Sequence, residues 1–410
     1  MYQTMVNGTS YIDTYHSRCM QRSCCRWLLA SLCLWLAACT EFSPAPVEFD
    51  NDDVVPVGQV HTLELHTRML SSLPVTGPPQ ADAEVELGRL LFWDPLLSGD
   101  RDTACATCHL PEHSYTDAQA RAIGTGGVGR GAERSAGPIG RVNRNSQTAL
   151  NVAWNGINEL GLFEPTEAPM FWDNRTLSLE EQALEPLKSQ QEMRGNGFAE
   201  DAILEEIEVR LNANTEYRQL FRDIYGVDNI DRTQLAHALA TFQRSLLANN
   251  APFDRWMRGE THAMTARQLS GMQEFVIAGC ADCHSGPLFS DFEVHVLGVA
   301  EAPGLTTPDE GDGQFAFRTP TLRQLEFTAP YFHGGQFATL DQVIDFYDAP
   351  RRSDNPLVPD SDLDAELLEV PEMEDGRGSL ILEFLQALND PDIDRQVPET
   401  VPSGLPPGGF

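Results

Sequence analysis

Two five-residue motifs carry the clearest chemistry in this 410-residue sequence. They read C-A-T-C-H at residues 105–109 and C-A-D-C-H at residues 280–284, so both have the pattern C-x-x-C-H. This spacing lets two thiols bond covalently to a haem while the next residue presents an imidazole to the iron. A zinc site would need further Cys or His in matched spacing, and a thioredoxin-like pair has no need of the histidine. We therefore predict two covalently bound haem c groups, held by Cys105, Cys108, Cys280 and Cys283.

The residue on the opposite face of each iron decides whether that haem binds small molecules or only transfers electrons. His109 is the expected proximal ligand of haem 1, and His113 follows it too closely to reach the other face. His61 and His66 precede the core of this domain, and His237 lies on an expected helix with a core or surface role. We therefore expect an open distal face on haem 1, where peroxide can bind.

Haem 2, with His284 as its proximal ligand, has several candidates for its sixth ligand. Met373 lies in an acidic stretch, which is a poor place for a buried thioether. His295 and His333 remain possible, although each fits better as a hydrogen-bonding residue. The residues alone leave this ligand open.

Five of the nine cysteines lie in the first 39 residues, a region with the features of an export signal. Arginines precede an apolar run at residues 27–38, which is too short to span a bilayer comfortably. The run ends in L-A-A-C, which resembles a bacterial lipobox. This predicts cleavage before Cys39 and acylation of the Cys39 thiol. A plain secretory signal is the alternative. The segment from Met20 alone would make a compact lipoprotein signal, so both Met1 and Met20 are candidates for the start. We expect a periplasmic lipoprotein that is anchored to the outer membrane and contacts the membrane only through Cys39.

The formal net charge is −33, from 61 acidic and 28 basic residues. This excludes a nucleic-acid surface built on general positive charge. It is consistent with attraction of cationic partners, and equally with an acidic surface that keeps the protein soluble. After signal removal, no cysteine remains for a disulfide framework beyond the lipid site and the two motif pairs.

Helical apolar spacing alternates with long irregular stretches along the rest of the chain. Helices are expected at residues 83–93, 177–187, 201–211, 231–246, 265–276, 340–347 and 379–388. Each cysteine pair follows a helix, so we expect a mainly α fold with two cytochrome c-like haem domains packed against each other and joined by irregular loops. The expected order is a signal peptide with lipobox at 1–39, a tether and docking segment at 40–80, an N-terminal haem domain at 81–250, a C-terminal haem domain at 251–390 and a disordered tail at 391–410.

Over about residues 84–390 the sequence resembles the bacterial di-haem cytochrome c peroxidases and their relative MauG. Besides both haem motifs, the matching segments are L-G-R-L-L-F at 87–92, R-N-S-Q-T at 144–148, F-W-D-N-R at 171–175, L-E-E-Q-A at 179–183, F-R-T-P-T-L-R at 317–323 and T-A-P-Y-F-H at 328–333. The resemblance implies that Trp172 lies between the haems. It also implies that Gln182 and Glu192 form a polar pair over the peroxidatic iron of haem 1, with Pro186 packed there.

The resemblance further implies a calcium ion at the domain interface, bound by Asn145, Thr328 and Pro330, since amide and carbonyl oxygens suit this hard cation. Two features depart from the family pattern. Asn174 replaces the usual glycine, and extra residues occur around 135–141 and 158–166. These insertions border the first haem domain and its access route.

Tyr347 takes the position where ordinary di-haem peroxidases place a methionine ligand to haem 2, as in MauG-like proteins. The displaceable distal histidine of ordinary peroxidases is also missing. The resemblance therefore favours a MauG-like enzyme that uses hydrogen peroxide to oxidise a protein or another electron donor. A cytochrome c peroxidase that removes peroxide with electrons from a small cytochrome c or cupredoxin is the alternative. A pure electron-transfer cytochrome fits poorly because haem 1 lacks a candidate for its sixth ligand. The sequence leaves the oligomeric state open between a monomer and a homodimer.

Overall fold

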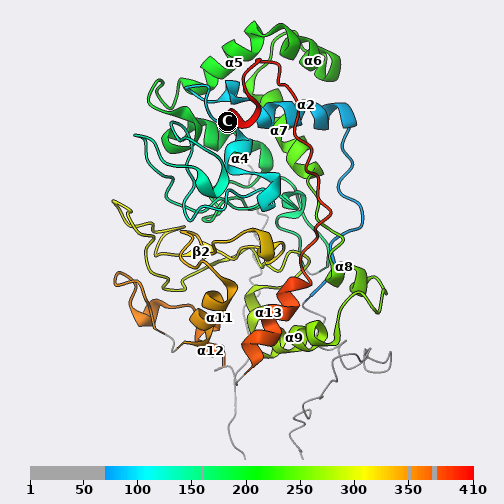
Figure 1. Cartoon of the computed structure of the whole chain (residues 1–410), viewed down its shortest axis with the longest axis vertical. Coiled ribbons are helices and arrows are strands. Elements are labelled where there is room, and N and C mark those ends of the chain that lie inside the picture. The colour runs from blue at the N-terminus through cyan, green and yellow to red at the C-terminus, as the bar shows by residue number, and fades with distance from the viewer. Residues whose placement is uncertain (1–69, 159, 350–351, 372–375) are drawn as a thin grey trace, which may run out of the picture. The chain divides into compact units, whose positions relative to one another are not determined.

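Two helices cross at the centre of the first half of the chain. The computed structural model describes residues 70–158, 160–349, 352–371 and 376–410. The α-helices of this half are α2 (Asp82–Trp93), α3 (Cys105–Cys108), α4 (Leu179–Lys188), α5 (Ile203–Ala213), α6 (Thr215–Tyr225) and α7 (Arg232–Ser245). α2 packs closely on α7 (Figure 1), because a Cβ on Gly88 would lie only 2.1 Å from the carbonyl oxygen of Ala238. Glycine is required there by the close approach of the two backbones.

Apolar side chains from these helices form a first hydrophobic core. Leu87 and Leu91 of α2 meet Leu235, Leu239 and Phe242 of α7, and all five are almost fully buried. They recur at the three- and four-residue spacing of one helical face, which is the pattern visible in the sequence. The long segments between the helices are loops with short 3₁₀ turns, apart from the π-helical turn η7 (Gln190–Arg194).

A second core lies in the other half of the chain. Its α-helices are α8 (Pro252–Met257), α9 (Ala266–Ile277), α10 (Cys280–Cys283), α11 (Leu340–Asp348), α12 (Ala365–Glu369) and α13 (Arg377–Gln386). α9 packs against α13, and Phe253, Phe275, Phe289 and Phe384 meet edge to face between them at centroid distances from 5.2 to 6.2 Å. Two short antiparallel strands, β1 (Val294–His295) and β2 (Phe317–Arg318), pair with Val294 opposite Arg318. The mainly α prediction is confirmed.

Four of the seven predicted helices begin at a side-chain cap. The side chain of Asp231 accepts hydrogen bonds from the first turn of α7, and Thr265 does the same for α9. Ser178 caps α4 and Thr339 caps α11 in the same way. These short polar side chains satisfy N–H groups that the helix itself leaves unpaired.

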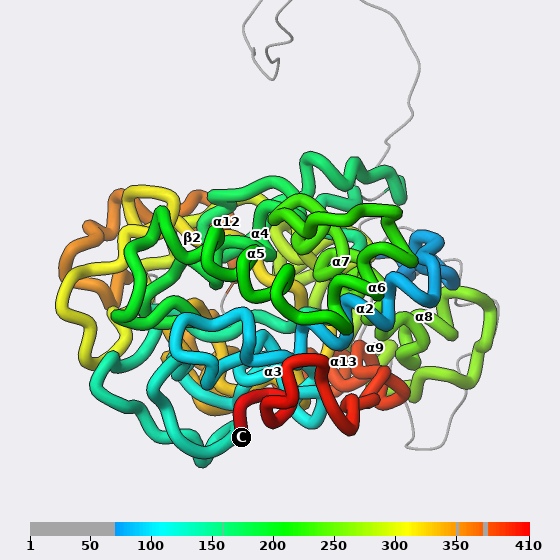
Figure 2. Tube along the Cα trace, turned by 90° about the horizontal axis from the view of Figure 1, so that it is seen from above, coloured from blue at the N-terminus to red at the C-terminus, as the bar shows by residue number. Residues whose placement is uncertain are grey.

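The C-terminal segment is ordered, which corrects the expectation of a disordered tail at 391–410. In Figure 1 the red trace leaves α13 and returns past α2, and Figure 2 shows it beside α3. Ile393 and Val401 are buried in the first core. The Thr107 hydroxyl donates to the carbonyl of Gly408 at 2.7 Å. A segment rich in Pro and Gly is therefore held by burial of single apolar side chains and by pairing of its backbone, neither of which composition reveals.

The segment before α2 also packs on the second half. Leu70 pairs with Gly286, and the backbone N–H of Leu73 donates to Asp254 Oδ1 at 3.0 Å. The expected signal peptide, Cys39 and the expected tether up to residue 69 lie outside the described residues. Within the described part of the chain, no helix is both long and apolar enough to cross a membrane.

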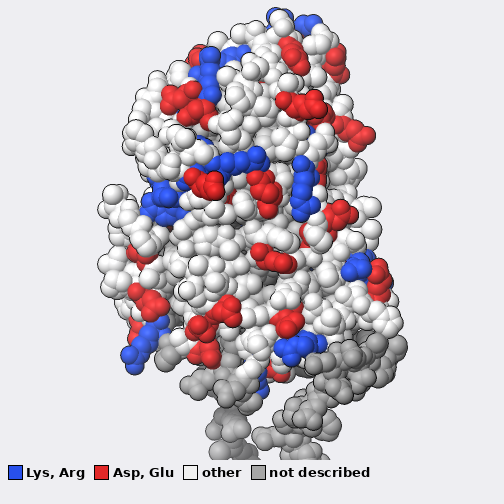
Figure 3. Space-filling view, viewed as in Figure 1, with Lys and Arg blue, Asp and Glu red and all other residues white. Residues whose placement is uncertain are grey.

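Acidic and basic side chains are interspersed on the face shown in Figure 3. The net negative charge of the chain is therefore not gathered into one acidic patch on that face. Some ion pairs are buried or half-buried. In one of them, Arg89 Nη2 of α2 lies 2.8 Å from Asp394 Oδ2 of the C-terminal segment, so this pair joins the segment to α2.

Asp94, at the end of α2, joins the C-terminal segment to the first core. Its buried carboxylate accepts hydrogen bonds from the hydroxyl of Tyr217 at 2.7 Å and from the hydroxyl of Ser403 at 2.6 Å. Ser403→Ala should lower the free energy of unfolding by about 1–3 kcal/mol, because a buried charged acceptor loses a partner. Urea unfolding measures the change. Ser361→Ala, which removes an exposed hydroxyl–carboxylate contact, is the control, and equal stabilities for both variants would contradict the prediction.

Candidate functional site

One cavity of about 600 Å³ is lined by both C-x-x-C-H motifs. The structure brings to its wall every site residue predicted from the sequence: Cys105, Cys108, His109, Asn145, Trp172, Gln182, Pro186, Glu192, Cys280, Cys283, His284, Thr328, Pro330 and Tyr347. These residues come from both halves of the chain. The cavity therefore joins the two predicted haem sites instead of separating them.

The two C-x-x-C-H motifs adopt the same local geometry. In each, a four-residue helix (α3 or α10) begins and ends at the two cysteines, and the histidine follows. Nδ1 of His109 lies 2.9 Å from the carbonyl oxygen of Tyr115, and Nδ1 of His284 lies 2.9 Å from that of Phe289. A carbonyl can only accept, so Nδ1 carries the ring proton and Nε2 keeps its lone pair for a metal.

The protonation of these groups fits covalent haem attachment. Burial lowers the pKa of His109 and of His284, which favours the neutral imidazole that binds iron. Burial also raises the pKa of Cys105 to about 12 and that of Cys108 well above its usual value, so the thiols of the first pair stay neutral. Two thiols and one neutral imidazole on each side of a shared cavity are the donor set that haem c requires.

Tyr115 and Phe289, the residues that orient the two histidines, were not predicted from the sequence. Both are aromatic, fully buried and in the left-handed backbone region, with φ of 60° and 53°. Such residues are uncommon at positive φ and persist where packing fixes them. An aromatic residue shortly after each motif is the one sequence signal that could have indicated them.

The polar pair expected over haem 1 is carried by α4 and the π-helical turn after it. Gln182 and Pro186 are four residues apart on α4, so they share one face, and both line the cavity. Glu192 lies in the π-helical turn, a distortion that often occurs at functional sites. Burial raises the pKa of Glu192, and the nearby positive charge of Arg175 partly opposes this.

Trp172 lies at the tip of a loop that is closed by pairing of Met170 with Thr176. Its side chain is 8% exposed, and its indole N–H donates to the carbonyl of Asn145 at 3.0 Å. The ring meets His333 edge to face with 6.5 Å between centroids. The indole is thus fixed in the wall shared by the two motifs.

Asn145 and Pro330, two of the three expected calcium ligands, are in contact. The side-chain amide nitrogen of Asn145 donates to the carbonyls of Gln119 at 2.9 Å and of Pro330 at 3.3 Å. Thr328 lines the same cavity. Binding of a cation here would require the amide oxygen of Asn145 to face it.

Tyr347 lies on α11, where its ring packs on Phe346 and Phe332 at centroid distances of 5.3 and 6.2 Å. It lines the cavity together with His284. Thr339 caps the start of α11, so Tyr347 is held on a regular helix.

The other candidates for the sixth ligand of haem 2 are less available. Both ring nitrogens of His295 face carboxylates, Nδ1 with Asp364 at 2.8 Å and Nε2 with Asp291 at 3.0 Å. His333 is stacked on Phe317 at a centroid distance of 3.6 Å. Met373 lies outside the described residues.

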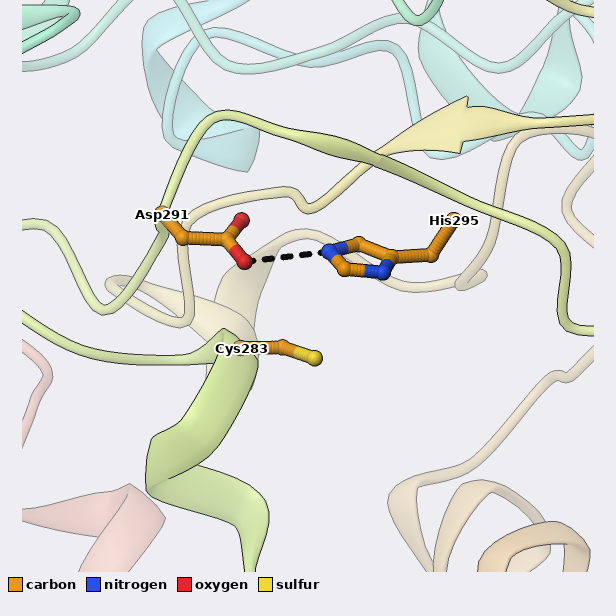
Figure 4. Close-up of side chains that lie close together, drawn as sticks. All are labelled: Cys283, Asp291 and His295. Atoms are coloured by element: carbon orange, nitrogen blue, oxygen red, sulfur yellow. Dashed lines mark hydrogen bonds and ion pairs between the residues drawn. The ribbon is translucent and has the colours of Figure 1, made fainter. Parts of the chain in front are cut away.

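Cys283, Asp291 and His295 lie close together beside the second motif (Figure 4). Each offers one donor atom within 4.8 Å of the others, a spacing that could hold a metal ion. Because Cys283 belongs to a C-x-x-C-H motif, its sulfur is required for haem attachment. We therefore assign this group to the surroundings of haem 2.

Two methionines that the sequence analysis did not weigh line the cavity. Met170 and Met193 are both 3% exposed, and the sulfur of Met170 accepts a contact from the amide of Asn155 at 3.4 Å. Among the described histidines, the cavity is lined by His109, His284, His295 and His333. Among the described residues of this wall, Met170 and Met193 are therefore further candidates for the distal face of haem 1.

Several known proteins resemble this chain in sequence. The family model "Di-haem cytochrome c peroxidase" matches residues 82–262. Cytochrome-c peroxidase IdrP1 of Denitromonas iodatirespirans is 35% identical over 314 residues, which cover 68% of this chain and 75% of the relative. Methylamine utilization protein MauG of Methylorubrum extorquens is 36% identical over 276 residues, covering 66% and 69%. The chain belongs to the di-haem cytochrome c peroxidase family.

A solved structure of a MauG-like protein associated with microbial copper homeostasis has the same fold. The TM-score is 0.62 at 23% identity, and the match covers 84% of this chain and 96% of that one. The resemblance inferred from the sequence is therefore confirmed, and the protein is a di-haem peroxidase-type oxidoreductase.

Asn174, where the resemblance to the di-haem peroxidases places a glycine, has a structural explanation. Its φ is 49°, in the left-handed region that glycine and asparagine tolerate best. Its side-chain amide donates to the carbonyl of Phe292 at 2.8 Å, which joins the Trp172 loop to the second half.

Asn174→Ala should therefore lower the free energy of unfolding by about 1–3 kcal/mol, through backbone strain and the lost hydrogen bond. Asn174→Gly keeps the backbone relaxed and should cost only about 0.5–1.5 kcal/mol. Chemical denaturation of the three proteins compares them. An alanine variant as stable as the glycine variant would show that the left-handed backbone does not select this residue.

Proposed function

We propose that this protein is an exported, MauG-like di-haem oxidoreductase that reduces hydrogen peroxide and oxidises a protein or another electron donor. The observation that carries the proposal is the shared cavity, where Glu192, Gln182, Trp172 and Tyr347 lie with both haem motifs. When bound, the haems supply an iron that reacts with peroxide at the first motif and an iron that stores oxidising equivalents at the second.

Glu192 has the properties of a proton-transfer group in this proposal. Peroxide bound near it must lose a proton from one oxygen and gain one on the other, and a single carboxyl group can do both. Gln182, on the same cavity wall, would orient the two oxygens by hydrogen bonding. The raised pKa of Glu192 brings its ionisation closer to neutral pH, where such a shuttle works best.

Trp172 and Tyr347 would connect the reaction to the second haem. The buried indole of Trp172 lies in the wall shared by the motifs and would pass charge between them. Tyr347 would bind the second iron through its phenolate, whose negative charge stabilises the oxidised metal more than a neutral thioether does. This ligand favours the MauG-like function over simple removal of peroxide.

A peroxide-scavenging cytochrome c peroxidase is the second candidate, favoured by the 35% identity to a relative with that name. It would take electrons from a small cytochrome c or cupredoxin. The two functions differ in the substrate oxidised, and Tyr347 is the residue that separates them. We further propose that calcium binds at Asn145, Thr328 and Pro330, which metal analysis of the wild type and of Asn145→Ala would test.

Glu192→Gln should lower peroxide turnover by about 10²–10⁴-fold while both haems stay attached, because attachment depends on the cysteines. If the ionised carboxylate starts the reaction, the wild-type rate should rise with pH through a pKa above the ordinary glutamate range, and this limb should vanish in the variant. Stopped-flow kinetics against pH measures both. Glu181→Gln, a change at an exposed position of α4 outside the cavity wall, is the control. A Glu192 variant with the turnover of this control would remove Glu192 from the reaction.

Tyr347→Met should raise the midpoint potential of haem 2, because a thioether stabilises ferrous iron better than a phenolate does. Redox titration of the wild type and the variant measures the change. Tyr331→Met is the control, since Tyr331 also lines the cavity but its hydroxyl donates to the carbonyl of Leu325 at 2.8 Å. If Tyr347→Met titrates like the wild type, Tyr347 is not the ligand.

We also propose periplasmic export and lipid anchoring at Cys39. Mass spectrometry of the mature N-terminus should find a diacylated or triacylated Cys39, and Cys39→Ser should release the protein from membranes. A soluble mature protein that begins at another residue would contradict the anchor without affecting the proposed chemistry.

A further inference from the structure

Three guanidinium groups and two carboxylates lie in and around the Trp172 loop. Arg144 pairs with both oxygens of Asp309 at 2.7 Å and with Asp173 at 2.7 Å. Arg175 pairs with the other oxygen of Asp173, also at 2.7 Å. Both carboxylates are therefore already held by two of the three arginines.

Arg318 is the third, and its partners are neutral. It is 6% exposed; Nε donates to the carbonyl of Phe171 at 2.8 Å and Nη2 to the side-chain oxygen of Gln147 at 3.1 Å. Nη1 has no hydrogen-bond partner among the described residues, and none of their carboxylates lies within 4.0 Å of the guanidinium. Burial lowers the pKa of Arg318 to about 10, which reflects the cost of a cation in this position.

Other buried arginines in the described part of the chain have partners on all three side-chain nitrogens, including Arg134, whose partners are carbonyls alone. Arg323 forms a double ion pair with Asp254 at 2.8 and 2.9 Å. Arg210 pairs with Glu206 and donates to the carbonyls of residues 96, 98 and 99. Burying an unpaired charge is costly, so the missing partner of Arg318 is expected where its side chain lines the cavity.

We propose that Arg318 binds a carboxylate group held in the cavity between the two C-x-x-C-H motifs. A planar guanidinium matches a carboxylate in shape as well as charge. Two sources have this chemistry: a carboxylate side chain of a haem bound in the cavity, or a small carboxylate from solution. The inference rests on the proposed di-haem function. It adds to that function by naming Arg318 as the cation that pairs with a carboxylate in the cavity.

The test is redox titration of the purified di-haem protein, with and without added acetate. Arg318→Gln removes the cation and should lower the midpoint potential of at least one haem, because a nearby positive charge favours the reduced iron. Arg210→Gln is the matched control: it removes a buried arginine that does not line the cavity, and should leave both potentials unchanged. If Arg318→Gln does not fold with both haems, Arg318→Lys is used instead. Lysine keeps the positive charge but lacks the planar guanidinium, so the midpoint potential should fall by less than in Arg318→Gln.

The acetate arm separates the two sources. If a haem carboxylate occupies the site, acetate leaves the wild-type potentials unchanged. If the site takes an anion from solution, acetate shifts them in the wild type and this response is lost in Arg318→Gln. Unchanged potentials in the Arg318 variants, together with an acetate response equal to that of the wild type, would overturn the proposal. Haem content and peroxide reactivity of the wild type test the proposed function separately.

Discussion

The hydrogen bond from Nδ1 of each motif histidine to a backbone carbonyl is the contact on which the rest of the site depends. It fixes the tautomer, so that Nε2 of His109 and of His284 is the atom left for iron. The two accepting carbonyls belong to buried aromatic residues at positive φ, held by the two separate cores. Each core thus determines the position of one iron ligand, and the cavity between the cores takes its geometry from them.

The wall between the motifs is built from both halves of the chain. Trp172 comes from the first half, but the carbonyls of residues 171 and 172 accept hydrogen bonds from Arg318, and Asn174 donates to the carbonyl of Phe292. The C-terminal segment crosses in the other direction and buries Val401 in the first core. The two halves therefore share structural residues, so changes to either half should affect the position of the groups between the haem sites.

The sequence was sufficient for features whose cause is local. The spacing of C-x-x-C-H, the caps at Asp231 and Thr265 and the apolar face of α2 each depend on residues within a few positions of one another. The family resemblance indicated site residues that are distant in sequence, and the structure places all of them in the wall of one cavity. The resemblance could not show the order of the C-terminal segment, whose stability comes from contacts with α2 and α3. Nor could it show that Arg318 lacks a carboxylate partner, since that depends on where Asp173 and Asp309 point.

The proposed reaction with peroxide depends most directly on an open distal face at the first haem, beside Glu192. Electron paramagnetic resonance of the resting, fully oxidised protein tests this, because the spin state reports whether iron has a sixth protein ligand. We predict one high-spin ferric signal from haem 1 and one low-spin signal from haem 2. Two low-spin signals without a high-spin component would contradict the account, and would indicate that a methionine such as Met170 or Met193 closes the first iron.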